Sequence, residues 1–311
     1  MPGPDRVLTM LDAAGTALAL GLGVALLGST ASAAEPALGT PPSYAAEHTV
    51  TDGPNHDAVD LRIWVPDLEA GDVPQGLTVL NDQVYVGTYR EDRAGPEDCR
   101  IHRFDARTGA LTGSADVPAA CSHAGGLAVA GGRLFLADSW ALIEIDPDAL
   151  FDPQRRANGV LRRVSLRFPL RGSFAAGTAD GLWIGEYKRS SGAGIRFVPL
   201  AAIDAADPVA GLGPDAIARE IPAPVRAQGA TIGPDGTLWV SASSSQFGRL
   251  YRLDPATGAV LGEYPAPVGS EDLGFDSQGR LWTVSEAGAA KYRNWPAFHP
   301  FVMRLRPEAL R

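Results

Sequence analysis

One pattern of apolar and polar positions recurs five times along the chain. Its clearest part is a short apolar strand with an aromatic residue in second place, at residues 84–88, 134–138, 182–186, 238–242 and 281–285. The starts of these strands are separated by 50, 48, 56 and 43 residues. A repeat of this length is typical of the blades of a β-propeller.

Each of these strands belongs to a larger repeating unit. A two-residue turn signal and a segment of small apolar residues precede it, which predicts a hairpin whose first strand lies in the crowded centre of the propeller. A third strand with alternating apolar and polar residues follows at 100–105, 141–146, 194–198, 249–254 and 301–305. Fourth, edge strands are predicted at 111–115, 163–166, 218–221 and 261–264.

The fifth unit ends at Arg311 without a fourth strand of its own. Residues 60–65 alternate correctly and precede the first inner strand, so they can complete the last blade and close the ring. We therefore predict an all-β fold, a single propeller of five four-stranded blades over residues 60–311. Six blades remain open as an alternative, because the third unit, at 56 residues, is long enough for extra strands.

Two of the repeats carry a family resemblance. The segments GGRLFLADS at 131–139 and PDGTLWVS at 234–241 resemble the repeats of NHL and YVTN propellers and of the senescence-marker-protein/gluconolactonase-like group. The resemblance implies the propeller fold more strongly than an activity. For the gluconolactonase-like enzymes it also implies a divalent cation in the channel, held by acidic and amide side chains.

The N-terminal segment differs from the rest of the chain. Residues 13–27 are apolar apart from one Thr, and Ala-Ser-Ala follows at 31–33, which predicts a signal peptide over 1–33 and a secreted, extracellular protein. Retention as an anchor is the alternative, although a membrane-spanning helix needs about 20 apolar residues. Residues 34–59 are rich in Pro, Ala and Gly and predict an extended or disordered lead-in.

Export would place the two cysteines in an oxidising compartment, where disulfides form. Cys99 and Cys121 are the only pair, and in an oxidising compartment they most simply form a disulfide. The alternative is a nucleophilic Cys121 that acts with His123.

The net charge of the sequence argues against nucleic acid as a partner. The sequence has 27 Lys and Arg against 36 Asp and Glu, a formal net charge of −9, and no basic run of the kind that nucleic acid requires. We expect a monomer without nucleic-acid partners, and without membrane contact after signal cleavage. The expected partner is a small molecule, a carbohydrate or a protein.

Polar residues gather where the inner strands start and the second strands end, which in a propeller is one face around the axis. The predicted ligand-binding residues at these positions are Gln75, Tyr89, Arg90, Ser173, Tyr187, Lys188, Gln228 and Glu286. An insertion at 287–300 adds Lys291, Arg293 and Trp295, whose cations and aromatic rings suit a carbohydrate or an anion. The alternative is that this insertion folds back and plugs the channel mouth.

Carboxylates near one axis repel each other unless a cation or a shared proton compensates. Asp138, Glu186 and Glu271 are therefore predicted metal ligands, and their oxygen atoms favour Ca²⁺ or Mg²⁺. The alternative is that they bond backbone amides of their own turns.

His123 is the one histidine at the predicted start of an inner strand, and with Glu271 it forms the candidate catalytic pair. A structural His123, bonded across the channel, is the alternative. Two functions follow: a secreted propeller that binds a small molecule or protein at the channel face, or a divalent-cation-dependent hydrolase or lactonase-like enzyme that uses the channel carboxylates and His123.

Overall fold

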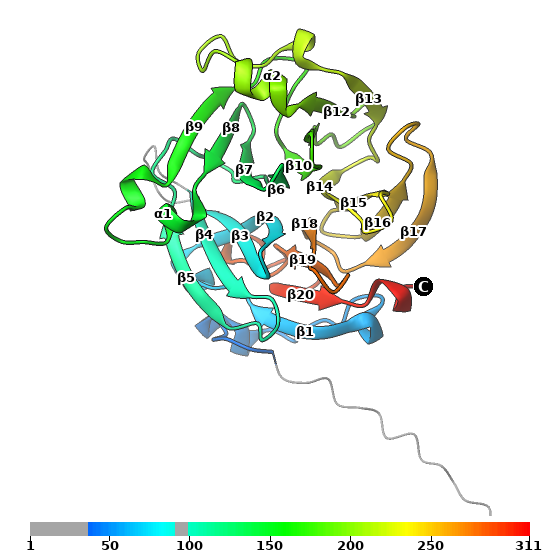
Figure 1. Cartoon of the computed structure of the whole chain (residues 1–311). Coiled ribbons are helices and arrows are strands. Elements are labelled where there is room, and N and C mark those ends of the chain that lie inside the picture. Colours follow the sequence, from blue (N-terminus) through cyan, green and yellow to red (C-terminus); the bar gives the residue numbers. More distant parts are fainter. Residues whose placement is uncertain (1–36, 91–98) are drawn as a thin grey trace, which may run out of the picture. The chain divides into compact units, whose positions relative to one another are not determined.

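Five four-stranded sheets form the molecule. The computed structural model describes residues 37–90 and 99–311, so the predicted signal peptide and the start of the lead-in lie outside the described residues. Within these ranges every sheet is antiparallel and has four strands, and Figure 1 shows the sheets arranged around a common centre. The prediction of a five-bladed propeller is confirmed.

The blades follow one another along the chain. Blade 1 consists of β2 (Asp72–Leu80), β3 (Gln83–Arg90), β4 (Cys99–Asp105) and β5 (Leu111–Asp116). Blade 2 consists of β6 (Gly126–Ala130), β7 (Arg133–Asp138), β8 (Ala141–Ile145) and β9 (Val160–Ser165). Blade 3 consists of β10 (Phe174–Gly177), β11 (Gly181–Gly185), β12 (Gly194–Pro199) and β13 (Arg219–Pro222). Blade 4 consists of β14 (Ala227–Ile232), β15 (Leu238–Ser243), β16 (Gly248–Leu253) and β17 (Val260–Ala266).

Blade 5 joins the two ends of the propeller. It combines β18 (Ser270–Phe275), β19 (Leu281–Ser285) and β20 (Phe301–Leu305) with β1 (Val59–Trp64), which pairs antiparallel with β20. The predicted closure by the N-terminal strand is confirmed. It leaves the ring without a gap between its first and last repeats.

Short helices occupy the connections. The extra length of the third unit forms α2 (Leu200–Ala205) and the 3₁₀ turn η5 (Pro214–Ala216), so in the described chain it adds no strand. The other short helices are η1 (Ser43–Glu47), η2 (His56–Ala58), η3 (Leu68–Ala70), α1 (Pro147–Leu150), η4 (Arg156–Asn158), η6 (Ala290–Tyr292) and η7 (Pro307–Ala309). None of the described helices is long and apolar enough to span a membrane.

The hydrophobic core is divided among the five interfaces between neighbouring blades. The second strand of each blade has both faces buried, which explains its continuous apolar run. The recurring aromatic residue in that strand packs against the next blade in every case, and these residues are Tyr85, Phe135, Trp183, Trp239 and Trp282.

Small residues on the inner strands allow neighbouring blades to approach closely. A Cβ atom at Gly126 would lie 2.5 Å from the backbone nitrogen of Ala175, and one at Gly229 would lie 2.2 Å from Cα of Asp272. Neither distance is compatible with a side chain. The predicted crowding at the centre is therefore present, and it brings the polar ends of these strands together.

The described part of the N-terminal lead-in, residues 37–58, packs on blade 5. Leu38 forms a parallel bridge with Ile63 of β1. The Tyr44 hydroxyl donates a hydrogen bond to the carbonyl of Gly288 over 3.1 Å, and the His48 ring stacks on Phe298 with centroids 4.6 Å apart. The segment thus contacts the insertion between β19 and β20.

The predicted disulfide is confirmed. Cys99 at the start of β4 is bonded to Cys121 in the link between blades 1 and 2, with their Cα atoms 5.6 Å apart. The bridge is consistent with an oxidising compartment.

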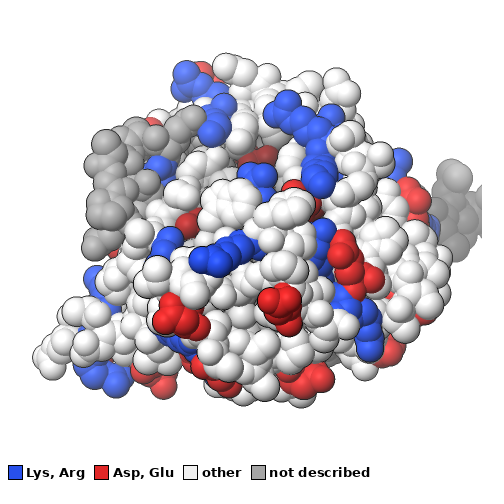
Figure 2. Space-filling model, turned by 90° about the horizontal axis from the view of Figure 1, so that it is seen from above, with Lys and Arg blue, Asp and Glu red and all other residues white. Residues whose placement is uncertain are grey.

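On the side of the molecule where α2 lies, Figure 2 shows basic and acidic side chains intermingled.

We expect the double substitution Cys99→Ser and Cys121→Ser to lower the free energy of unfolding by about 3 kcal/mol, because the bridge closes a loop between residues 22 apart. Urea denaturation of the oxidised protein and of the variant measures the difference. Reductant should destabilise the wild type and leave the variant unchanged. A wild type whose stability does not respond to complete reduction would contradict the prediction.

Candidate functional site

Three of the inner strands carry a β-bulge at the same end. The register shifts between Pro74 and Leu77 in β2, between Ala227 and Gly229 in β14, and between Ser270 and Leu273 in β18. A bulge adds a residue and redirects the side chains beside it. The residues within these bulges include Gln75, Gln228 and Glu271, so blades 1, 4 and 5 each direct a polar side chain to one end of the channel.

Four side chains form a hydrogen-bonded row across that end. The Gln75 amide donates to Oε2 of Glu286 over 2.9 Å, and the Gln228 amide donates to Oε1 of Glu271 over 2.8 Å. The carboxyl groups of Glu271 and Glu286 are hydrogen-bonded to each other, which requires a proton between them. The exposed fractions of Glu271 and Glu286 are 1 % and 6 %.

Burial controls the ionisation of this carboxyl pair. It raises the pKa of Glu286 from 4.5 to about 7, against the effects of the hydrogen bonds from Gln75 and Glu271 and of the charge of Lys291. Burial and the charge of Glu286 raise the pKa of Glu271 well above its ordinary value. The pair therefore retains a shared proton at neutral pH, with Glu286 the first to ionise.

Aromatic residues and a lysine lie beside the pair. The ammonium of Lys291 donates to the Tyr89 hydroxyl over 3.3 Å, and that hydroxyl is also hydrogen-bonded to Tyr292. The rings of Tyr292 and Trp295 lie 4.4 Å apart. Burial raises the pKa of both tyrosines, so their hydroxyls stay protonated at neutral pH. The insertion thus brings Lys291 and Trp295 to the mouth of the channel, and it also places Tyr292 there.

His123 approaches the same group through Tyr89, with ring centroids 5.1 Å apart. Burial is the main cause that lowers the pKa of the imidazole, and the charges of Lys291 and Arg171 add to it. Within the described chain, no side chain is hydrogen-bonded to this ring. His123 is therefore a neutral imidazole at neutral pH, with ring nitrogens that a ligand can use.

Asp272 follows Glu271 and is fully buried, with no exposed surface. Its carboxylate accepts backbone N–H groups from three other inner strands: Leu77 at 2.9 Å, Leu127 at 2.9 Å and Ala230 at 3.0 Å. Burial raises the pKa of Asp272 well above its ordinary value, and these donors oppose the rise. This residue joins blades 1, 2, 4 and 5 at the axis, and it leaves Glu271 as the neighbouring carboxyl group that faces the site.

The three predicted metal ligands have separate partners. Oδ1 of Asp138 accepts the backbone N–H groups of residues 122–124 at 2.7 to 3.3 Å, and Oε2 of Glu186 lies 3.1 Å from Nζ of Lys188. Glu271 bonds Gln228 and Glu286, as above. In the described residues, the groups of potential ligands that lie close enough for one ion do not include this trio.

One of those groups is a carboxylate and histidine cluster in blade 1: Asp67, Asp72 and His102. Arg90 and the Thr88 hydroxyl bond Asp72 at 2.5 and 2.8 Å, and His102 lies 3.4 Å from it. Arg90, predicted to bind ligand, therefore neutralises a buried carboxylate here. The sequence offered no signal for this cluster beyond the alternation of its strands.

The remaining predicted ligand-binding residues lie around the same end of the channel. Lys188 bonds the carbonyl of Gly192 at 2.9 Å besides its ion pair, and Ser173 donates its backbone N–H to Gly185 at 2.9 Å. Tyr187 is partly buried and Arg293 is exposed. None of these residues is hydrogen-bonded to the carboxyl pair in the described chain.

Comparisons with known proteins find similar solved structures but no similar sequence. No family model and no curated protein matches the sequence. The glutaminyl cyclase of Myxococcus xanthus is similar in structure, with a TM-score of 0.52 at 12 % identity over 80 % of this chain and 94 % of that chain. At this identity the match supports the fold alone.

Two further solved propellers resemble this chain. A luciferin-regenerating enzyme matches with a TM-score of 0.44 at 10 % identity, over 81 % of this chain and 96 % of that chain. The virginiamycin B lyase of Staphylococcus aureus matches with a TM-score of 0.37 at 16 % identity, over 73 % and 82 %. The fold of this chain is thus that of a β-propeller, as its own sheets show.

Proposed function

We propose that the protein binds a small polar ligand at the mouth of its channel, and that the Glu271–Glu286 pair receives a cationic amine of that ligand. The observation that carries the proposal is the buried pair itself. With one shared proton it has a net charge of −1, and a cation is the group that such a charge favours. Gln75 and Gln228 hold the two carboxyl groups in place, which reduces the ordering that binding requires.

The surroundings of the pair suit an amine with an apolar body. Tyr89 and Tyr292 provide ring surface near the carboxyl groups, Trp295 packs on Tyr292, and His123 provides a neutral hydrogen-bonding ring. An ammonium group that replaces the shared proton would leave both carboxylates ionised. Binding would therefore release the shared proton. It would also strengthen as the pH rises through about 7, because below that pH both carboxyl groups are protonated and the pair has no charge.

Benzylamine and its neutral counterpart benzyl alcohol are suitable probes, because both offer a ring and only one carries a charge. We expect Glu286→Gln to weaken benzylamine binding about 10-fold or more and to leave benzyl alcohol unaffected, since a charged hydrogen bond contributes about 1.5–3 kcal/mol. Titration calorimetry at pH 8 measures both affinities. The matched control is Glu263→Gln, which changes an exposed glutamate paired with Arg249. Equal binding of both probes, or binding unaffected by Glu286→Gln, would refute the proposal.

A second candidate function is divalent-cation-dependent hydrolysis of an ester or lactone, with His123 as general base. The neutral imidazole of His123, which packs against Tyr89, favours it. The carboxyl oxygens of Glu271 and Glu286 are ligands of the type that Ca²⁺ prefers, and the cation would supply charge stabilisation for a polarised carbonyl oxygen. Asp272 is not part of this set, because backbone N–H groups occupy its oxygens.

For this candidate, millimolar Ca²⁺ should raise the melting temperature by several degrees, and Glu271→Gln should abolish the rise. Hydrolysis of an ester and lactone panel should fall at least 100-fold in His123→Ala, as expected for loss of a general base. Thermal melting and a pH-stat assay measure the two effects. Absence of any calcium shift, or hydrolysis that persists in His123→Ala, would eliminate the hydrolase.

A further inference from the structure

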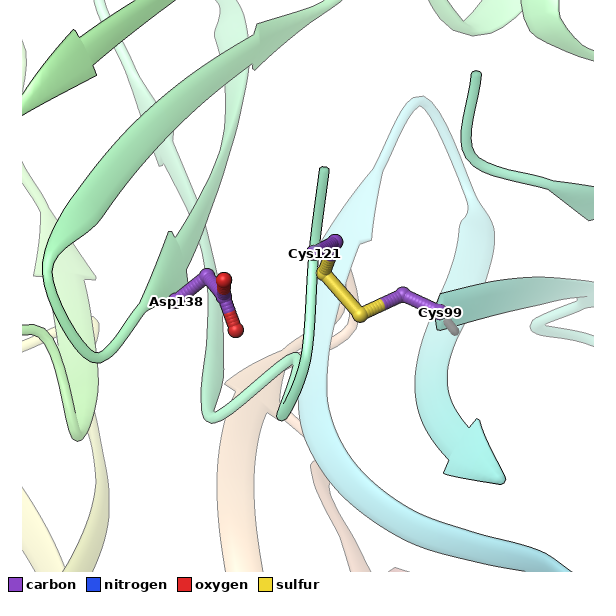
Figure 3. Close-up of side chains that lie close together, drawn as sticks. All are labelled: Cys99, Cys121 and Asp138. Carbon is purple, nitrogen blue, oxygen red and sulfur yellow. A yellow bond between two sulfur atoms is a disulfide. The ribbon is translucent and has the colours of Figure 1, made fainter. Parts of the chain in front are cut away.

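The disulfide has a carboxylate for a neighbour. The Asp138 carboxylate lies beside Cys99 and Cys121, and ligand atoms of the three residues all lie within 4.8 Å of one another (Figure 3). The residues come from β4, from the link before β6 and from the end of β7. Two blades therefore converge on one buried point, where the exposed fractions of the three residues are 1 %, 4 % and 5 %.

Backbone contacts fix Asp138 at this point. Its Oδ1 accepts N–H groups from Ser122, His123 and Ala124, whereas its Oδ2 accepts a hydrogen bond from Ser122 alone, at 3.2 Å. These donors are the residues that follow Cys121 directly. The carboxylate is thus tied to the loop that carries one of the sulfur atoms, and Oδ2 retains the capacity for a further partner.

We propose that, once the disulfide is reduced, Cys99, Cys121 and Asp138 bind one Zn²⁺ ion between blades 1 and 2. Reduction by a dithiol breaks the sulfur–sulfur bond, transfers two electrons and two protons to the cysteines, and oxidises the dithiol to its own disulfide. Zn²⁺ then displaces the two thiol protons, which pass to solvent, and no further electron transfer is involved. Zinc replaces the lost covalent connection between the blades.

The geometry suits zinc. Tetrahedral zinc has Zn–S bonds of about 2.3 Å and Zn–O bonds of about 2.0–2.2 Å, which place neighbouring ligand atoms roughly 3.5–3.8 Å apart. The Cα atoms of the two cysteines lie 5.6 Å apart, which allows two thiolates to separate to that distance. The carboxylate oxygen lies within 4.8 Å of the sulfur atoms, so it must move by about 1 Å at most to reach the ligand spacing of zinc. Two thiolates select Zn²⁺ over Ca²⁺ and Mg²⁺, and water takes the fourth position.

Cobalt is the probe, because tetrahedral Co²⁺ with thiolate ligands has a charge-transfer absorption that reports sulfur coordination. The full chain is reduced with a phosphine, freed of oxygen and titrated with Co²⁺, and Zn²⁺ is then added in competition. We expect one equivalent of Co²⁺ to develop the absorption in the reduced protein and one equivalent of Zn²⁺ to remove it. The oxidised protein should show no such absorption.

Asp138→Asn tests the carboxylate, because the amide oxygen can still accept the backbone N–H groups that fix the loop. We expect this variant to bind Co²⁺ at least about 10-fold more weakly after reduction, whereas Asp207→Ala, at an exposed turn, should bind like the wild type. Circular dichroism follows the fold in every sample. Absence of the absorption in the reduced wild type would overturn the proposal. So would equal affinities in the wild type and Asp138→Asn, whether the reduced chains are folded or not.

Discussion

Replacement of Asp272 by Ala is expected to lower the free energy of unfolding by about 4 kcal/mol or more, because it removes one acceptor from several buried donors. The N–H groups of Leu77, Leu127 and Ala230 would lose their partner at once. A buried donor without a partner costs about 1–3 kcal/mol, and these three lie on strands of three different blades. No other described side chain accepts backbone N–H groups from so many blades.

The measurement is urea denaturation of Asp272→Ala beside a matched control. Asp207 also accepts two backbone N–H groups, from Val209 and Ala210 at 2.9 and 2.7 Å, but within an exposed local turn. We expect Asp207→Ala to lose far less stability than Asp272→Ala, because water can replace its carboxylate. If the two variants lose the same amount, Asp272 does not hold the blades together. A variant of Asp272 that does not fold agrees with the prediction.

The second large effect is a dependence of stability on pH that comes from Glu286. Its pKa in the folded protein is about 7 and its ordinary value is 4.5, so the folded state holds the proton more tightly than the unfolded chain. Below about pH 4.5 both states are protonated. Between about pH 4.5 and pH 7 only the folded state keeps the proton, so folding stability falls by about 1.4 kcal/mol per pH unit, and the loss, about 3 kcal/mol in total, is complete once the pH has risen through 7. Glu271 shifts in the same direction and adds to this loss.

Glu286→Gln should remove the dependence that Glu286 causes. The neutral amide keeps an acceptor for Gln75 and offers a donor to Glu271, so we expect a variant that is more stable than the wild type at pH 8 and similar to it at pH 4.5. Denaturation at intervals between these values provides the comparison, and Glu263→Gln should follow the wild-type curve. A wild type whose stability is constant or increases over this range would contradict the effect.

The architecture was predictable because each of its signals repeats. The second strands, with an aromatic residue between apolar neighbours, must be buried on both faces, and the structure packs each aromatic residue against the next blade. The strand at residues 60–65 was the unmatched element of an otherwise regular series, and a closed ring leaves it one position. Repetition therefore compensated for the weakness of each local signal.

The site was predictable only in part, since its geometry depends on irregularities. Strand alternation predicts only that Glu271 and Asp272 lie on opposite faces. Because of the bulge in β18, Glu271 lies at the channel mouth, and Asp272 accepts backbone N–H groups from three other blades. Nothing in the spacing of Gln75 and Gln228 shows that their amides bond these carboxyl groups. Tyr292 lies in the insertion at 287–300. The other repeats have no equivalent of this insertion, so its position could not be predicted by comparison with them.

The proposed amine site and the pH dependence both require a proton shared between Glu271 and Glu286, and carbon-13 NMR of the full chain with labelled glutamate carboxyl carbons follows the ionisation of each carboxyl group. Glu271→Gln and Glu286→Gln assign the two resonances. We predict that the Glu286 carboxyl titrates with a pKa of about 7 and that Glu271 remains protonated at that pH. Two carboxyl groups that both ionise near 4.5, with no shift of one when the other is replaced, would contradict the account.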